Sequence, residues 1–177
     1  MRNKITYIIG IDPSGAFNEG KGTTGYCVIR LQKNLLIKVV GELRATDYDT
    51  AEVYWQAHLD KIKELRSQYH NAVVSVEDYV LYASKALSQT NSHFETSQLI
   101  GCIKLYCWQQ KIKLYMRPAV AVKLRWSDIV LVRCKYLTQQ GKEYYCKVCS
   151  APLSLHIRDS IRHAIHCGVF DLKKGAN

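Results

Sequence analysis

The chain has 177 residues, of which 47% are hydrophobic and 23% are charged. These values are ordinary for a soluble globular protein, and the length fits a single domain, residues 1–177, that buries about two thirds of its unfolded surface. Lysine and arginine (25) outnumber aspartate and glutamate (15), which gives a net charge of +10. Such an excess favours a polyanionic partner, most often nucleic acid; the alternative is a basic surface without a special partner.

No charged-then-apolar leader opens the sequence, and no uninterrupted apolar segment approaches the roughly 20 residues that span a membrane. We therefore expect an intracellular, cytoplasmic protein that has no membrane partner. The seven cysteines are an odd number. In a chain without an export signal they indicate reduced thiols or metal ligands rather than a disulfide framework.

Three apolar runs near the start of the chain predict strands, at residues 5–12, 26–29 and 35–40. The connections between them are short or rich in glycine, which is typical of an antiparallel meander. A capping box, Asp49 with Glu52, is followed by apolar residues at every third or fourth position. This pattern predicts the first long helix.

The second half of the chain continues with alternating strands and helices. Residues 73–77 predict a fourth strand, which should pair in parallel with a neighbour because a helix precedes it. A second capping box, Ser92 with Glu95, predicts a helix through residue 109. Residues 112–116 then predict the fifth strand.

Pro118 suits the first position of a short helix that ends at Arg125. In the last helix, which begins near residue 156, apolar residues form a core stripe and polar residues lie on the other side. The core stripe consists of Ile157, Ile161, Ala164 and Ile165, and the polar side of His156, Asp159, His163 and His166. The element order βββαβαβα predicts an α/β fold with a mixed five-stranded sheet, three antiparallel strands plus two parallel ones, flanked by helices.

Residues 126–155 show no single period, and we interpret them as an insertion into this fold. The pair Cys146 and Cys149 is half of a zinc site, and Cys134 can supply a third thiolate. A fourth ligand for a structural Zn²⁺ would come from Cys167 or from one of the histidines of the last helix, His156, His163 or His166. The alternative is a set of cysteines that bind no metal.

Three acidic residues, far apart in sequence, lie on segments expected to be rigid. Asp12 ends the first strand, Glu77 ends the fourth strand, and Asp159 lies in the last helix. A carboxylate at the end of a buried strand costs several kcal/mol to desolvate unless a cation compensates it. Each acid alone is also explained by a turn, an exposed strand end or a solvated helix face. Together they predict a shared divalent-cation site of the kind that hydrolyses phosphodiesters.

Four motifs surround or accompany these acids: Ile9-Gly10-Ile11-Asp12-Pro13-Ser14-Gly15 with Thr24-Gly25-Tyr26, Val76-Glu77-Asp78, Pro118 to Lys123, and His156-Ile157-Arg158-Asp159-Ser160-Ile161. Together they resemble the motifs of the RuvC family of Holliday junction resolvases, within the RNase H-like superfamily. The resemblance spans residues 5–125 and 155–168 and leaves the insertion unexplained. It implies an RNase H-like fold. The length and the insertion look more like a virus-encoded member, which would work in the host cytoplasm.

By this resemblance, Asp12 bridges two Mg²⁺ or Mn²⁺ ions about 4 Å apart, while Glu77 and Asp159 hold one ion each. One ion would activate water, and the other would stabilise the leaving 3′ oxygen. His156, three residues before Asp159, shares its helix face and would serve as a ligand or a proton donor. His156 cannot play this part and ligate zinc as well.

The resemblance also implies branched DNA as the partner and a homodimer as the active form. An aromatic residue after the second acid, Tyr79 or Tyr82, would stack on an unpaired base at the crossover. Basic residues on segments that flank the site can line a phosphate-binding groove, or each can be a plain solvated charge. They are Lys21, Lys85, Lys104, Lys111, Lys123, Arg125, Arg158 and Arg162. The helix at residues 92–109 corresponds to the dimer interface of the family, although its face can equally be buried within one protomer.

We therefore predict a structure-selective endodeoxyribonuclease that resolves four-way junctions or other branched DNA during DNA recombination and repair. It would nick strands symmetrically as a dimer, by two-metal-ion hydrolysis, and leave 5′-phosphate ends. Two alternatives stay open. One keeps the fold and the chemistry but acts on RNA–DNA hybrids, or on forks and flaps. The other is a non-catalytic, zinc-containing DNA-binding module.

Overall fold

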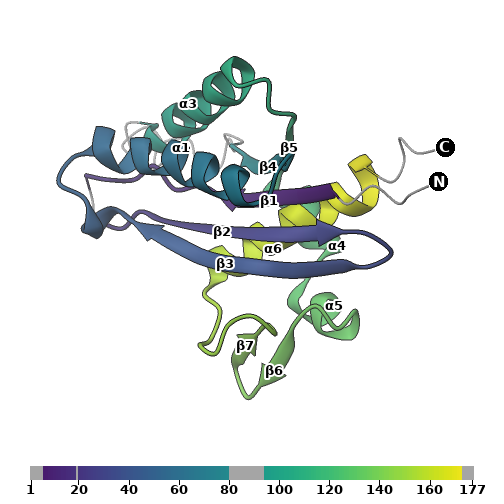
Figure 1. The fold of residues 1–177 in the computed structure, drawn as a ribbon. Helices are drawn as coiled ribbons and strands as arrows, with labels where there is room; N and C mark the ends of the chain where they lie inside the picture. The colour runs from purple at the N-terminus through teal and green to yellow at the C-terminus, as the bar shows by residue number, and fades with distance from the viewer. Residues whose placement is uncertain (1–5, 19, 80–93, 173–177) are drawn as a thin grey trace.

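The structure is a computed structural model that describes residues 6–18, 20–79 and 94–172. Five strands form one sheet in the order β3-β2-β1-β4-β5, and a two-stranded hairpin, β6-β7, lies apart from it (Figure 1). The strands are β1 (Thr6–Asp12), β2 (Thr23–Leu31), β3 (Leu35–Arg44), β4 (Val73–Asp78), β5 (Leu114–Pro118), β6 (Thr138–Gln140) and β7 (Glu143–Tyr145). The helices are α1 (Ala51–Gln68), α3 (Glu95–Gln109), α4 (Ala119–Arg125), α5 (Asp128–Arg133) and α6 (Leu155–His166), with a 3₁₀ turn at Ala45–Asp47 and a π-helical turn at Cys167–Leu172.

The sheet is mixed, as the sequence predicts. β1, β2 and β3 form an antiparallel meander, whereas β4 pairs in parallel with β1 on one side and with β5 on the other. β2 and β3 are longer than predicted because the pairing continues through two glycines, with Gly25 opposite Glu42 and Gly41 opposite Tyr26. The predicted α/β fold with a mixed five-stranded sheet is confirmed.

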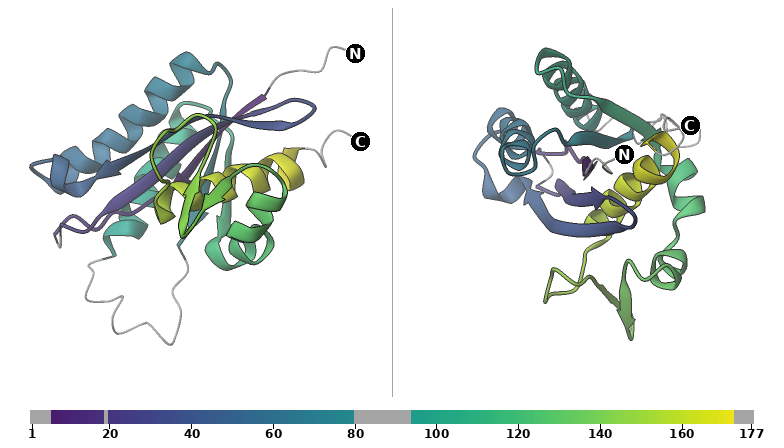
Figure 2. Two further views of the ribbon diagram at one scale, coloured as in Figure 1. Left: turned by 90° about the horizontal axis from the view of Figure 1, so that it is seen from below. Right: turned by 45° about the vertical axis from the view of Figure 1, so that its right-hand side comes forward.

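Helices cover both faces of the sheet, and each face has its own hydrophobic core. α1 and α3 lie together on one face, where Ile9 and Leu99 are buried. α6 lies on the other face with α4 and residues 126–155, where Ile8 and Ile161 are buried (Figure 2). β1 is therefore covered on both sides, which explains its unbroken apolar run. Because β1 and β4 are parallel neighbours, their carboxyl ends lie side by side.

Two helix starts differ from the predicted ones by one residue. α1 is capped by Thr50, whose hydroxyl accepts a hydrogen bond from the backbone N–H of Val53 at 3.3 Å, so the predicted cap Asp49 lies just before it. Pro118 ends β5 and precedes α4 instead of forming its first residue. No helix within the described ranges is long and apolar enough to cross a membrane.

The insertion at residues 126–155 forms α5 and the β6-β7 hairpin, on the side of the sheet that α6 covers (Figure 1). Five of its residues are buried in the same core as the apolar stripe of α6: Trp126, Leu131, Leu137, Cys146 and Leu153. The insertion therefore adds elements to the predicted order without changing the sheet. That the whole chain is one domain stays a prediction.

α6 lies directly on the backbone of β1 and β2. A Cβ atom at Gly10 would come within 2.2 Å of the backbone oxygen of Ser160, and one at Gly25 within 2.1 Å of the backbone carbonyl of His156. Real Cβ atoms essentially never approach other atoms closer than 3.0 Å. Only glycine at these two positions lets the helix come this close to the sheet.

We expect Gly10→Ala to lower the free energy of unfolding by about 1–3 kcal/mol, because the added methyl group forces α6 away from β1. Urea denaturation followed by circular dichroism measures this change. Gly101→Ala on α3 is the matched control, since a Cβ atom there meets nothing within 4 Å. It should leave stability unchanged or raise it by up to about 1 kcal/mol. A Gly10→Ala variant as stable as the parent protein would contradict the close contact.

Candidate metal centre

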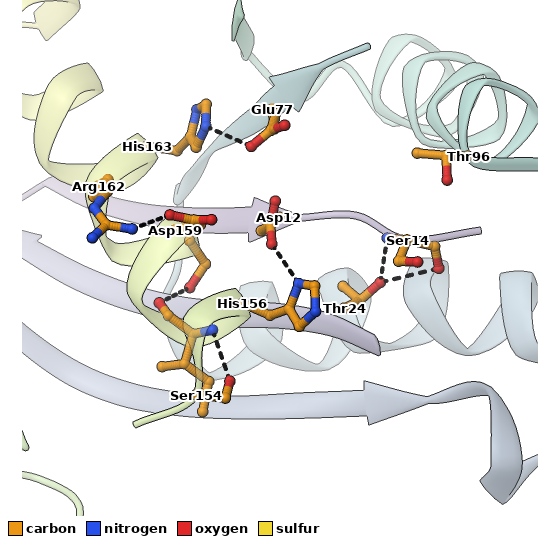
Figure 3. Close-up of polar contacts among 12 residues, drawn as sticks. Asp12, Ser14, Thr24, Glu77, Thr96, Ser154, His156, Asp159, Arg162 and His163 are labelled. Carbon is orange, nitrogen blue, oxygen red and sulfur yellow. Dashed lines mark hydrogen bonds and ion pairs between the residues drawn. The ribbon is translucent and has the colours of Figure 1, made fainter. Parts of the chain in front are cut away.

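Asp12, Glu77 and Asp159 converge at one end of the sheet. Asp12 is the last residue of β1, Glu77 lies one residue before the end of β4, and Asp159 is in the first half of α6 (Figure 3). Each acid offers a carboxylate oxygen within 4.8 Å of those of the other two. Asp159 is 2% exposed, Asp12 is 8% exposed, and Glu77 is half-buried. Three carboxylates this close repel one another in a low-dielectric setting unless cations or protons compensate them.

Two histidines of α6 face two of these acids. His156 places Nδ1 at 2.8 Å from Oδ2 of Asp12, and the buried His163 places Nε2 at 3.3 Å from Oε2 of Glu77. The two histidines are seven residues apart, close to two helical turns, so they lie on the same side of α6. The sequence places His163 on this polar side but gives no sign that Glu77 lies opposite. Each histidine can orient the carboxylate that it faces.

Two permanent cations face the third acid. Arg162 donates from Nη1 to Oδ1 of Asp159. Lys123, on α4, places Nζ at 2.8 Å from Oδ2 of Asp159 and at 4.0 Å from Oε2 of Glu77. The sequence predicts that Lys123 lines a groove for DNA, whereas the structure places its ammonium group among the acids. Lysine and arginine therefore supply part of the positive charge that the cluster needs.

The acids differ in how readily they ionise. Burial raises the pKa of Asp12 to about 6, although the hydrogen bond from His156 opposes this and the charges of the other two acids add to it. Burial alone would raise the pKa of Glu77 as well. The imidazole of His163 outweighs this effect together with other contacts, so that the pKa of the Glu77 carboxyl is below its ordinary value. The bond to Asp12 raises the pKa of His156. The charge of Asp12 therefore needs a compensating cation more than the charge of Glu77 does.

This set of donors fits a divalent cation. Carboxylate oxygens are the ligands that Mg²⁺ and Mn²⁺ prefer in proteins. Oε2 of Glu77 is buried and, among the described residues, has no hydrogen-bond partner of good geometry. An unsatisfied buried oxygen beside two further carboxylates is an arrangement that a bound cation completes. The cluster of Asp12, Glu77 and Asp159 can therefore bind a divalent metal.

The loop after Asp12 is hydrogen-bonded to α3. Glu95, the first residue of α3, is buried, and its carboxylate accepts a hydrogen bond from the backbone N–H of Phe17 at 2.9 Å. The hydroxyl of Thr96 accepts another from a backbone N–H of the same loop at 3.1 Å. The sequence predicts that Glu95 pairs with Ser92 in a capping box. Ser92 lies outside the described residues, so the capping box stays a prediction, and the carboxylate of Glu95 accepts hydrogen bonds from the loop.

α1 holds the same loop from a second side. The hydroxyl of Tyr54 donates to the carbonyl oxygen of Ser14 at 2.8 Å, and the backbone N–H of Ser14 donates to the hydroxyl oxygen of Thr24 at 2.9 Å. Nε2 of His58 lies 2.8 Å from that same hydroxyl. Burial lowers the pKa of His58 to about 4, so its imidazole is neutral at physiological pH. The backbone next to Asp12 is therefore held by both helices on this face of the sheet.

The residues predicted to contact DNA lie in different settings. Tyr82 and Lys85 are outside the described residues. Tyr79 is half-buried and packs against the core on the α1 and α3 side. Of the predicted basic residues that the structure describes, five are exposed: Lys21, Lys104, Lys111, Lys123 and Arg125. Their contact with DNA stays a prediction.

Arg158 and Arg162 point into the protein. Both donate to the carboxylate of Asp128, at the start of α5, and Arg162 is only 5% exposed. The sequence predicts that they bind phosphate groups, because an arginine on the polar side of a helix is usually solvated. Nothing in the sequence pattern indicates that Asp128 lies opposite them. With these partners, the two arginines are engaged inside the fold.

The cysteines that could hold zinc do not gather with other ligands. Cys134 is exposed, Cys146 is buried, and the thiol of Cys149 donates to a backbone carbonyl at 3.4 Å. Within the part of the chain that the structure describes, three metal-ligating side chains come together only at the acidic cluster. His156 faces Asp12. This arrangement gives no support to a structural zinc site.

We expect Asp12→Asn to stabilise the metal-free protein at pH 8 by about 1–3 kcal/mol. The pKa of Asp12 is raised in the folded state to about 6, above its ordinary value of 3.8. The protonated carboxyl therefore contributes stability at low pH that is lost as the pH rises through about 6, and asparagine avoids this loss. Urea denaturation in EDTA at pH 4 and pH 8 measures the effect, which should shrink at pH 4.

The exposed Asp49 provides the control, because Asp49→Asn removes a carboxylate outside the acidic cluster and should change stability little at either pH. Lower stability of Asp12→Asn at pH 8 would show that the charge of Asp12 is already compensated.

Comparison with known proteins agrees with this geometry. No protein-family model matches the sequence, and no curated protein matches it. The chain is similar to RuvC from Thermus thermophilus in complex with a Holliday junction substrate, with a TM-score of 0.70 at 13% identity over 95% of this chain and 96% of that one. A second RuvC structure from this organism gives a TM-score of 0.64 at 14% identity over 94% of this chain and 96% of that one. The chain therefore has the RNase H-like fold of RuvC, as its motifs predict.

Proposed function

We propose that the protein is a structure-selective endodeoxyribonuclease that cuts branched DNA, with four-way junctions as its preferred substrate. The observation that carries this proposal is the convergence of Asp12, Glu77 and Asp159 from β1, β4 and α6 of an RNase H-like fold. One solved structure with this fold is RuvC in complex with a Holliday junction substrate, which supports a branched substrate here. The net charge of +10 supports a polyanionic partner.

The carboxylates of Asp12, Glu77 and Asp159 would hold two Mg²⁺ or Mn²⁺ ions. When bound, such ions activate a water molecule and stabilise the leaving 3′ oxygen. The fold holds the three carboxylates on rigid elements, since Asp12 and Glu77 lie on paired strands and Asp159 lies on a helix packed against the sheet. Rigid elements hold ligands at defined positions before the substrate arrives.

Two further residues are suited to the chemistry. His156 uses Nδ1 to hold Asp12, and its side chain is partly exposed, so its Nε2 can exchange a proton with the DNA or with solvent. Its raised pKa favours the protonated form, which suits a proton donor for the leaving oxygen. Lys123 is also partly exposed, and its flexible stem allows it to turn from the acids to a DNA phosphate.

We also propose a homodimer that forms through α3. Trp108, near the end of this helix, is 77% exposed, and Leu105 is exposed beside it. Leu105 and Trp108 lie on one face of the helix, and exposed apolar surface of this kind marks an interaction site. A second copy would bring two acidic clusters to one junction, as symmetrical nicks require.

The protein should cut a synthetic four-way junction in Mg²⁺ or Mn²⁺ and leave 5′-phosphate ends, and EDTA should stop the reaction. Asp12→Asn should lower the cleavage rate by more than about 100-fold because it removes the charge of a metal ligand, while junction binding in a mobility-shift assay is retained. Asp49→Asn should cut at the parent rate. Forks, flaps and RNA–DNA hybrids are tested in parallel. Unchanged cleavage by Asp12→Asn, or a clear preference for hybrids, would defeat the assignment.

Trp108→Glu should convert the dimer into a monomer in sedimentation velocity, because two buried charges would oppose each other across the interface. Val53→Glu is the matched control, since Val53 is an exposed apolar residue on α1. It should keep the parent mass. A parent protein that sediments as a monomer, or a Trp108→Glu variant that stays dimeric, would contradict the interface.

A further inference from the structure

The insertion at residues 126–155 is linked to the acidic cluster through an arginine of α6. Asp128, in the first turn of α5, accepts hydrogen bonds from two arginines of α6, with Oδ2 bonded to Arg158 and Oδ1 bonded to Arg162. The guanidinium group of Arg158 also lies over the ring of Tyr144, at 4.6 Å from the ring centroid. The carboxylate of Asp128 is thus held in place by α6 and the hairpin.

Arg162 connects this carboxylate to the metal centre. Its guanidinium group donates from Nη2 to Asp128, from Nη1 to Oδ1 of Asp159, and from Nε to the backbone carbonyl of Trp126 at 2.8 Å. Arg162 and Asp159 are both almost fully buried. The planar fork of an arginine matches three acceptors arranged in this way, so its position is fixed by the insertion.

In this arrangement the two carboxylate oxygens of Asp159 have different partners. Oδ1 accepts from Arg162, whereas Oδ2 faces Lys123 on the side of the acidic cluster. The arginine therefore sets the rotation of the carboxylate and leaves one oxygen directed toward the cluster. When a residue that hydrogen-bonds to a metal ligand is removed, the affinity for the metal typically falls by about 10–100-fold.

The charge of Asp128 matters as well as its position. A guanidinium group next to a metal ligand repels a divalent cation, and this repulsion is strong where solvent is excluded. The carboxylate of Asp128 partly neutralises the positive charge of Arg162 and so weakens that repulsion. If Asp128 loses its charge, Asp159 is the one carboxylate left to pair with Arg162. Their ion pair becomes stronger, and Asp159 binds a divalent cation less tightly.

We propose that Asp128 and Arg162 are positioning residues for Asp159, through which the insertion at residues 126–155 sets the affinity of the acidic cluster for divalent cations. The proposal rests on the proposed function, since it concerns the same cluster. It gives the insertion a task that its lack of periodic pattern does not reveal. It also gives Arg158 and Arg162 a task other than contact with DNA.

The experiment is a titration of the DNA-free protein with Mn²⁺, read by isothermal titration calorimetry and by electron paramagnetic resonance. Asp128→Asn should raise the dissociation constant for Mn²⁺ by about 10–100-fold. Asp128→Glu keeps the charge and should restore most of the affinity. Asp171→Asn is the matched control, because Asp171 also pairs with an arginine, Arg117, outside the cluster. It should bind Mn²⁺ as the parent protein does.

Thermal unfolding is measured for each variant, so that a loss of fold is separated from a loss of affinity. A folded Asp128→Asn variant that binds Mn²⁺ as tightly as the parent protein overturns the proposal. If Asp128→Asn does not fold, Arg162→Lys takes its place, since a lysine keeps the charge but cannot reach all three acceptors. Parent-like affinity in Arg162→Lys would overturn the proposal equally.

The same titration separates this proposal from the proposed function. Asp12→Asn is included, and it should weaken Mn²⁺ binding more than any other variant. If the parent protein binds no Mn²⁺, or if Asp12→Asn binds as the parent does, the nuclease assignment and the positioning role both fail. If Asp12→Asn loses binding while Asp128→Asn keeps it, only the positioning role fails.

Discussion

The contact between the α6 backbone and the sheet determines the geometry of the whole site. The helix rests on Gly10 of β1 and Gly25 of β2, and neither position carries a side chain that would separate the helix from the strands. A helix whose backbone contacts the backbone of the strands has little freedom to slide or tilt, whereas two elements separated by side chains can shift as the side chains repack. His156 therefore meets Asp12, and Asp159 meets the end of the sheet, at positions set by the path of the main chain. The carboxyl ends of β1 and β4 complete the frame because these strands are parallel neighbours.

Charge compensation is the second property that the site depends on. Three acids are brought together at a cost in repulsion and desolvation, and the fold offsets this cost with nearby groups on α6 and α4. The compensation is uneven. Asp159 lies between two permanent cations, Arg162 and Lys123, whereas Asp12 has only an imidazole and a pKa raised to about 6. A divalent cation would therefore gain most at Asp12, which every other acid of the cluster also approaches.

The acids could be predicted from the sequence because their signals are local. Asp12 and Glu77 end apolar runs, and Asp159 lies on the polar side of an amphipathic helix, so these elements, together with the resemblance of the motifs to a known family, group the three acids. Contacts between distant elements have no such signal. Glu95 shows the pattern of a helix cap but bonds to a loop 78 residues earlier, and Asp128 bonds to an arginine 34 residues later. Both contacts follow from tertiary packing, which overrides local preference.

The partners of the acids on α6 occupy a stretch of only eight residues, from His156 to His163. Each residue of an α-helix advances the chain by about 100° around the axis. A single residue added or lost between His156 and His163 would turn the later side chains by about 100° relative to the earlier ones, so that the two histidines could not both face their acids. This stretch of α6 can therefore accept neither an insertion nor a deletion. The turn between β6 and β7, which supports no such pairing in its exposed tip, is free to vary in length.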